Sequence, residues 1–138
     1  MDSLTRRSAL RWLGEGFSER SGIKVELVIG DGLERLPRDT ATALFRVAQE
    51  SLSNVHRHSR SSWARIVIGR IDNALHLEIA DGGCGFPSRP GCDPIRDSQG
   101  VGVGVSGMRI RLEQLRGTLD IVSGPSGTRV TATVPLEP

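Results

Sequence analysis

Apolar residues recur at steps of three and four along three segments of the chain, a spacing that predicts helices with one buried face. These segments are residues 4–20, 39–58 and 105–115. In the second segment, either Asp39 or Thr40 is expected to cap the first turn, because both side chains can accept a backbone hydrogen bond. The chain is therefore expected to contain three helices with apolar faces.

Alternation of apolar and polar residues predicts strands in five further segments. Two of them, residues 63–71 and 74–80, are separated only by Asp72-Asn73, which is typical of a β-hairpin. The other predicted strands span residues 24–29, 118–123 and 128–135. Because the helices and hairpins segregate along the chain, the expected fold class is α/β: a two-layer α/β sandwich with helices on one face of a mixed, mostly antiparallel sheet.

Size and charge restrict the range of functions. At 138 residues the chain is long enough for one domain with a single core. Its 18 Lys and Arg nearly balance its 16 Asp and Glu, so the net charge of +2 gives no electrostatic reason to expect nucleic acid or an anionic membrane as a partner. The two cysteines favour reduced thiols in a cytoplasmic setting. No apolar run approaches the ~20 residues that span a bilayer.

Glycine is the compositional outlier, and several of the 17 glycines gather in residues 82–85 and 100–107. Glycine lets a backbone approach a ligand closely because no Cβ intervenes, although a single Gly pair would indicate only an ordinary turn. Residues 81–100 form a predicted loop of roughly twenty residues that is rich in Gly, Pro and Asp. Loops of this length within a compact domain are usually functional or mobile.

Polar residues on the second predicted helix form the first candidate site: Glu50, Asn54, Arg57 and His58. Their spacing of i, i+4, i+7 and i+8 predicts that they project from one face, roughly opposite the apolar stripe. Spacing alone favours a solvated polar face. The residue types favour chemistry, because together they offer a general base, a hard oxygen ligand for Mg²⁺ and two groups directed at phosphate.

Asp81 and the glycines after it form a second candidate site at the end of a predicted strand. The carboxylate could accept a hydrogen bond from the amino group of a buried base while Gly83 and Gly85 let the backbone close over it; an ordinary Asp-Gly turn is the alternative. A third candidate is the segment 102–107 at the start of the last helix, where backbone amides can bind phosphate. A loop precedes these glycines where a nicotinamide-binding fold needs a strand, and the P-loop pattern GxxxxGK[ST] does not occur.

Three motifs together resemble those of the ATP-binding (HATPase_c) domain of the GHKL superfamily, which includes gyrase-type, chaperone and histidine-kinase ATPases. Residues 44–59 resemble the N-box of nitrate-sensor-like two-component sensor histidine kinases, with the sequence LFRVAQESLSNVHRHS. Residues 79–86 resemble the G1 box, with the sequence IADGGCGF, and residues 102–136 resemble the G2 box with its following helix and strands. The resemblance covers about residues 24–136 and implies a Bergerat-type ATP-binding fold.

The resemblance implies a role for each matching residue. Glu50 would polarise the attacking group, Asn54 would hold Mg²⁺ through its side-chain oxygen, and Asp81 would bind the adenine amino group. The other ATP-binding positions would shape the pocket, contact phosphate or support bound water: Arg57 (in place of the usual Lys), His58, Gly83, Gly85, Gly102, Gly104, Val105 (in place of the usual Leu), Gly107 and Thr128. Residues 86–101 would form the ATP lid.

The implied function is that of a sensor histidine kinase, which binds Mg-ATP and donates the γ-phosphoryl group to a histidine for relay to a response regulator. The acceptor would lie on the dimerisation helix bundle of the same kinase, because His56, His58 and His76 all lie within the ATP-binding region. Residues 1–22 would be the end of that bundle and residues 23–138 the catalytic domain, so this chain alone would not phosphorylate itself. The alternatives are a GHKL serine kinase of the anti-sigma type and a non-catalytic ATP-binding module.

Overall fold

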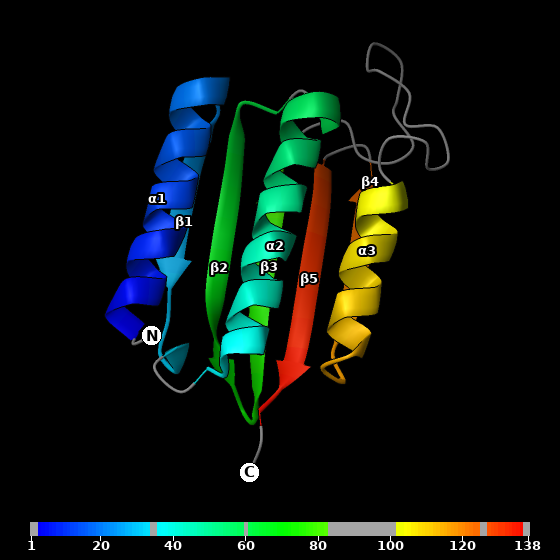
Figure 1. Cartoon of the computed structure of the whole chain (residues 1–138). Helices are drawn as coiled ribbons and strands as arrows, with labels where there is room; N and C mark the ends of the chain where they lie inside the picture. Colours follow the sequence, from blue (N-terminus) through cyan, green and yellow to red (C-terminus); the bar gives the residue numbers. More distant parts are fainter. Residues whose placement is uncertain (1–2, 34–35, 60, 83–101, 125–126, 137–138) are drawn as a thin grey trace.

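The computed structural model describes residues 3–33, 36–59, 61–82, 102–124 and 127–136, whose helices and strands form two layers (Figure 1). The helices are α1 (Ser3–Ser21), α2 (Arg38–Asn54), which continues as a π-helical turn (η2, Val55–Ser59), and α3 (Gly102–Glu113). The strands are β1 (Lys24–Ile29), β2 (Trp63–Ile71), β3 (Ala74–Asp81), β4 (Thr118–Gly124) and β5 (Gly127–Pro135). Every predicted element is present, with ends displaced by only a few residues.

The strands of the described chain form one mixed sheet in the order β1-β2-β3-β5-β4. β1 and β2 pair in parallel, and the other neighbours pair antiparallel. The three helices lie side by side across one face of this sheet (Figure 1). The predicted two-layer α/β sandwich, mostly antiparallel with helices on one face, is confirmed. Among the described helices, none is long and apolar enough to cross a membrane.

The core lies between the helices and the sheet, and alternation along the strands decides which side chains enter it. In β3 every second residue is buried, and β2 follows the same pattern over its first half. The largest fully buried side chains come from both layers: Leu33, Leu44, Val47, Leu52, Ile66, Leu75, Leu77, Ile79, Leu112, Leu119 and Val134. Because apolar burial is the main driving force for folding, it also fixes the registers that align these side chains.

The first turns of α2 and α3 differ from the predictions. Pro37, and neither Asp39 nor Thr40, is the N-cap residue of α2, and no side chain among the described residues caps it by a hydrogen bond. The proline ring fixes a φ of −59° there, while Thr40 is buried within the helix. The predicted cap is therefore wrong. α3 begins at Gly102 rather than at position 105, so its predicted start is three residues late.

Segments distant in the sequence meet at one end of the sandwich. α2 and β3 both end there, whereas α3 and β5 both begin there (Figure 1). Asp81 is the last residue of β3, and it pairs with Thr128 of β5. The polar end of α2 and the sequence motifs around residues 81 and 102 therefore belong to the same end of the molecule.

α1 packs into the same core as the other elements. Its Leu10, Leu13 and Phe17 are buried, and a Cβ at Gly14 would lie 3.3 Å from Cγ1 of Val25 on β1. The Phe17 ring also meets the ring of His56 edge-on, with the centroids 6.2 Å apart. The division of the chain after residue 22 stays a prediction, but in the folded chain α1 covers one side of the sheet.

Phe17→Ala is expected to lower the free energy of unfolding by about 3–5 kcal/mol, because it leaves a cavity between α1 and the sheet. Trp12→Ala is the matched control: Trp12 lies on the same helix with 71% of its surface exposed, so its removal should change stability by less than about 1 kcal/mol. Urea denaturation followed by circular dichroism measures both. Equal losses for the two variants would contradict the packing of α1.

Candidate functional site

A row of polar side chains crosses three strands at the end of the sheet where β3 terminates. Alternate residues of β3 from Leu75 onward enter the core, and Asp81 continues this alternation at the strand end. Thr128 lies opposite Asp81, and its Oγ1 lies 3.2 Å from Oγ of Ser123 on β4. Asp81 and Thr128 are each only 8% exposed. A carboxylate and two hydroxyls therefore end the apolar core on the side that faces the helices.

The backbone around Asp81 is held on two sides. A Cβ on Gly127 would clash with the carbonyl oxygen of Asp81, and the φ of +139° at Gly127 is one that other residues rarely adopt. A Cβ on Gly82 would lie 2.7 Å from Nε1 of Trp63 on β2. Ser61 Oγ accepts hydrogen bonds from the amides of Trp63 and Gly82, each at 3.1 Å. The backbone position of Asp81 is thus set by close packing against β5 and β2.

One arginine joins two of the predicted site residues at the end of α2. Nη2 of Arg57 donates a hydrogen bond to Oδ1 of Asn54 at 3.0 Å and forms an ion pair with Oε2 of Glu50 at 3.4 Å. Arg57 belongs to the π-helical turn, and helical side chains lean toward the helix N-terminus, so its guanidinium reaches back over the last turns of α2. The structure therefore brings Glu50, Asn54 and Arg57 together.

The prediction that this polar face lies opposite the apolar stripe is wrong for Asn54. Asn54 is 8% exposed, whereas Glu50 is half-buried and Arg57 is exposed. Ser51, one turn earlier, is 2% exposed, and its Oγ has no hydrogen-bond partner among the described residues. Buried hydroxyls normally have a partner. The inner side of this helix end therefore carries polar atoms within otherwise apolar surroundings.

The remaining predicted site residues are placed only in part. His58 lies in the π-helical turn, and Gly102, Gly104, Val105 and Gly107 lie in the first half of α3. Outside the described residues lie Gly83, Gly85 and the predicted lid at 86–101. The roles predicted for all these positions stay predictions.

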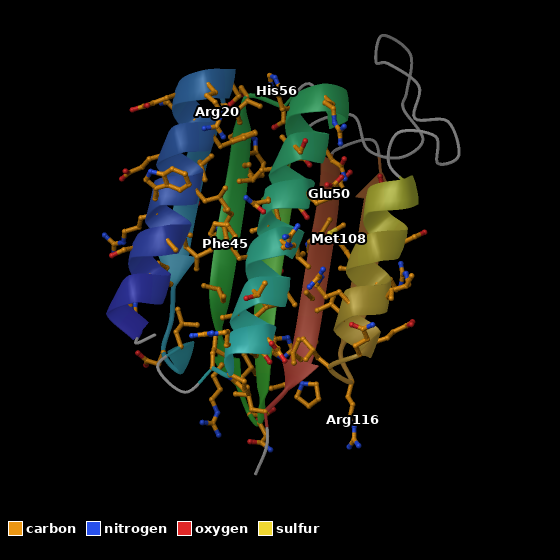
Figure 2. The ribbon with its side chains drawn as sticks, in the orientation of Figure 1. Arg20, Phe45, Glu50, His56, Met108 and Arg116 are labelled. Atoms are coloured by element: carbon orange, nitrogen blue, oxygen red, sulfur yellow. The ribbon has the colours of Figure 1, made fainter. Side chains whose placement is uncertain are left out.

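A groove between α2 and α3 leads to this end of α2. It has a volume of about 410 Å³, with Glu50 on the α2 side and Met108 on the α3 side (Figure 2). Gly107, Arg46 and Arg111 also line it, so two guanidinium groups accompany one carboxylate. This excess of positive charge suits an anionic group. A larger, mainly apolar cavity of about 620 Å³ lies between α1 and α2, and none of the predicted site residues lines it.

The donor atoms at this end fit a magnesium nucleotide. Oδ1 of Asn54 and the carboxylate of Glu50 are oxygen donors of the kind that Mg²⁺ prefers. No cluster of three or more His, Cys, Asp or Glu side chains occurs in the described part of the chain. The N-terminus of α3 lies at the same end, and helix N-termini favour phosphate.

Sequence analysis did not identify three residues that lie near the site: Ser51, Trp63 and Ser123. For Ser123 a signal exists, because alternation in β4 places it on the face of Leu119 and Ile121, opposite Thr128 across the hairpin. For Ser51 the signal is its helical spacing within the buried stripe. The Trp63–Gly82 contact has no local signal, because it depends on the pairing of β2 with β3.

Comparisons with known proteins identify the family. The family model described as "Histidine kinase-, DNA gyrase B-, and HSP90-like ATPase" matches residues 39–138, and the chain belongs to this family of ATP-binding domains. The sensor histidine kinase MctS of Rhizobium johnstonii is 33% identical over 98% of this chain and 28% of its own length. UhpB of Salmonella typhimurium, a signal transduction histidine-protein kinase/phosphatase, is 37% identical over 98% of this chain and 25% of its own length.

Solved structures with the same fold are also histidine kinases. The histidine kinase domain of the Erythrobacter litoralis blue-light activated histidine kinase superposes with a TM-score of 0.73 at 18% identity, covering 95% of this chain and 64% of that one. AdeS of Acinetobacter baumannii gives 0.72 at 15% identity, covering 96% and 65%. The family model therefore places the chain among the histidine kinase-, DNA gyrase B- and HSP90-like ATPases, and the solved structures share its fold. The chain spans only 25–28% of the length of the two curated relatives.

Gly127→Ala is expected to destabilise the fold by about 2–4 kcal/mol, because its Cβ would meet the Asp81 carbonyl at a backbone angle unfavourable for alanine. Gly107→Ala is the matched control, because nothing lies within 4 Å of its Cβ position and alanine favours a helix by up to about 1 kcal/mol. Thermal unfolding measures both variants. If Gly127→Ala left the stability unchanged, the close approach of β5 to Asp81 would be wrong.

Proposed function

We propose that this chain acts in a two-component sensor histidine kinase, where it binds Mg-ATP and donates the γ-phosphoryl group to a histidine. The acceptor histidine lies on the dimerisation helix bundle of the same kinase, and a response regulator receives the phosphoryl group next. The observation that carries the proposal is the meeting of Asp81 and the Glu50–Asn54–Arg57 group at one end of the sandwich, beside the N-terminus of α3.

Asp81 recognises the adenine in this proposal. Its buried carboxylate continues an apolar row, so a flat base can lie against apolar side chains while its amino group donates a hydrogen bond to the carboxylate. Hydrogen bonds to charged acceptors in such surroundings are stronger than those in water. The adjacent hydroxyls of Thr128 and Ser123 can hold a water molecule that bridges to the base.

The end of α2 and the start of α3 bind the phosphates and the metal. Asn54 holds Mg²⁺ through Oδ1, and the bound ion supplies charge neutralisation for the phosphates. Arg57 and His58 contact phosphate oxygens from the π-helical turn, and the free backbone amides in the first turn of α3 donate hydrogen bonds to phosphate. These groups hold the γ-phosphoryl group close to Glu50 before it is transferred.

Glu50 acts on the incoming acceptor from the groove between α2 and α3. Its carboxylate accepts a proton from, or orients, the acceptor imidazole, while phosphoryl transfer itself depends mainly on in-line positioning. His56 contacts Phe17, and His76 lies near Thr133 with Nδ1 and Oγ1 3.4 Å apart. Neither histidine lines the groove, which is consistent with an acceptor on another domain.

Asp81→Asn is expected to weaken ATP binding by about 1–3 kcal/mol, because an amide leaves the adenine amino group mispaired. GTP presents a carbonyl at that position and should bind poorly to the unmodified chain. Asp120→Asn, at an exposed carboxylate on β4, is the control and should leave ATP affinity unchanged. Isothermal titration calorimetry measures all three. Equal affinities for ATP and GTP would contradict the role of Asp81.

Transfer is tested with γ-labelled Mg-ATP and the dimerisation bundle of the same kinase, purified and supplied in trans. The bundle is expected to take up acid-labile, base-stable label, and the chain alone should remain unlabelled. Glu50→Gln should slow labelling by about 10²–10⁴-fold with little change in ATP affinity. Glu113→Gln, at an exposed carboxylate of α3, should label the bundle at the normal rate.

The kind of label decides among the alternatives. Acid-stable label on a partner protein would favour a serine kinase. Binding of ATP with no transfer to the bundle would favour a non-catalytic module. Acid-labile label on the isolated chain would show that an acceptor histidine lies within it and would contradict the proposed arrangement.

A further inference from the structure

Arg57 contacts one oxygen of Asn54 and one of Glu50. The proposed function assigns the first to Mg²⁺ and the second to the acceptor histidine. Nη2 of Arg57 donates to Oδ1 of Asn54 at 3.0 Å, and the same nitrogen lies 3.4 Å from Oε2 of Glu50. The proposed metal ligand therefore already has a cationic partner, and the carboxylate proposed to act on the acceptor is already paired. One side chain couples the metal site to the catalytic site.

These contacts conflict with a metal ion bound at Asn54. An Mg²⁺ ion held by Oδ1 of Asn54 would share that oxygen with the guanidinium of Arg57, and the two positive charges would repel each other. The existing pair can break readily, because the side chains of Arg57 and Glu50 are 47% and 31% exposed and exposed ion pairs contribute little. A phosphate group is a stronger partner for a guanidinium.

We propose, on the basis of the proposed function, that Arg57 is a positioning residue that exchanges partners when nucleotide binds. In the structure its guanidinium bridges Asn54 and Glu50; with a triphosphate it moves to the terminal phosphate. The move frees the Asn54 oxygen for the metal and the Glu50 carboxylate for the acceptor. A diphosphate has no γ-phosphate, so releasing Arg57 is not compensated. The exchange makes the site favour a triphosphate over a diphosphate when Mg²⁺ is present.

Calorimetric titration with Mg-ADP and with a non-hydrolysable Mg-ATP analogue tests this exchange without any readout of catalysis. Arg57→Gln is expected to bind Mg-ADP roughly two- to fivefold more tightly, because nothing then competes for the Asn54 oxygen. The same variant should bind the analogue roughly tenfold more weakly, because the phosphate contact is lost. Arg57→Lys keeps the charge and should restore most of the preference for the analogue.

Arg65→Gln is the matched control, because Arg65 forms an ion pair with Glu26 of β1 at 3.2 Å and its side chain is 51% exposed, close to the 47% of Arg57. Arg65→Gln should change the affinity neither for Mg-ADP nor for the Mg-ATP analogue, and its melting temperature should match that of Arg57→Gln. Unchanged or weaker Mg-ADP binding by Arg57→Gln would overturn the exchange, since a simple phosphate contact or a purely structural role gives that result.

A second measurement needs no variant. Adding Mg²⁺ to the unmodified chain should increase its affinity for the triphosphate analogue more than its affinity for ADP, and equal increases would also overturn the exchange. If the unmodified chain bound neither nucleotide, the proposed function itself would fail. If it bound both and Arg57→Gln bound Mg-ADP no more tightly, only the exchange would fail.

Discussion

The antiparallel register between β3 and β5 is the constraint on which the rest of the site depends. It pairs Ile79 with Val130 and Asp81 with Thr128, so a row of apolar pairs leads directly to a polar pair. A shift by one residue would turn Asp81 to the face of the sheet that bears no helix, and the apolar row would turn with it. The burial of hydrophobic side chains in the middle of the strands therefore holds a carboxylate in place at their end.

Much of this arrangement follows from local patterns in the sequence. The alternation in β3 and the step of three or four in α2 were sufficient to predict both elements and their buried faces, because each pattern reports the environment of its own element. The hairpin at Asp72 and Asn73 was predicted from turn chemistry, and Asp72 has the positive φ of 56° that such turns need. The helical period likewise predicted that Glu50 and Arg57 share a face.

What the sequence could not predict depends on residues brought together from different elements. Helical spacing predicts only the direction in which the Asn54 side chain leaves α2. Whether that side chain is buried depends on the elements that surround the last turn of the helix. The Pro37 cap was missed because Asp and Thr are common capping residues, whereas Pro37 makes no side-chain capping hydrogen bond that a pattern search could anticipate. The functions of the site residues also lie beyond the pattern, because the same carboxylate, amide and guanidinium could form a solvated face. Their roles therefore remain proposals.

The pairing of β3 with β5 also affects how the family can diversify. After Asp81 the chain leaves β3, and it returns to the partner position of Asp81 at Thr128 of β5; α3 and β4 lie between these two residues in the sequence. The entropic penalty for closing a loop rises with the logarithm of its length, by only about 0.6 kcal/mol for each doubling. A change in the length of the connection between β3 and β5 should therefore shift the register of Asp81 and Thr128 little. Evolution can vary the length of that stretch in related chains while the carboxylate keeps its place.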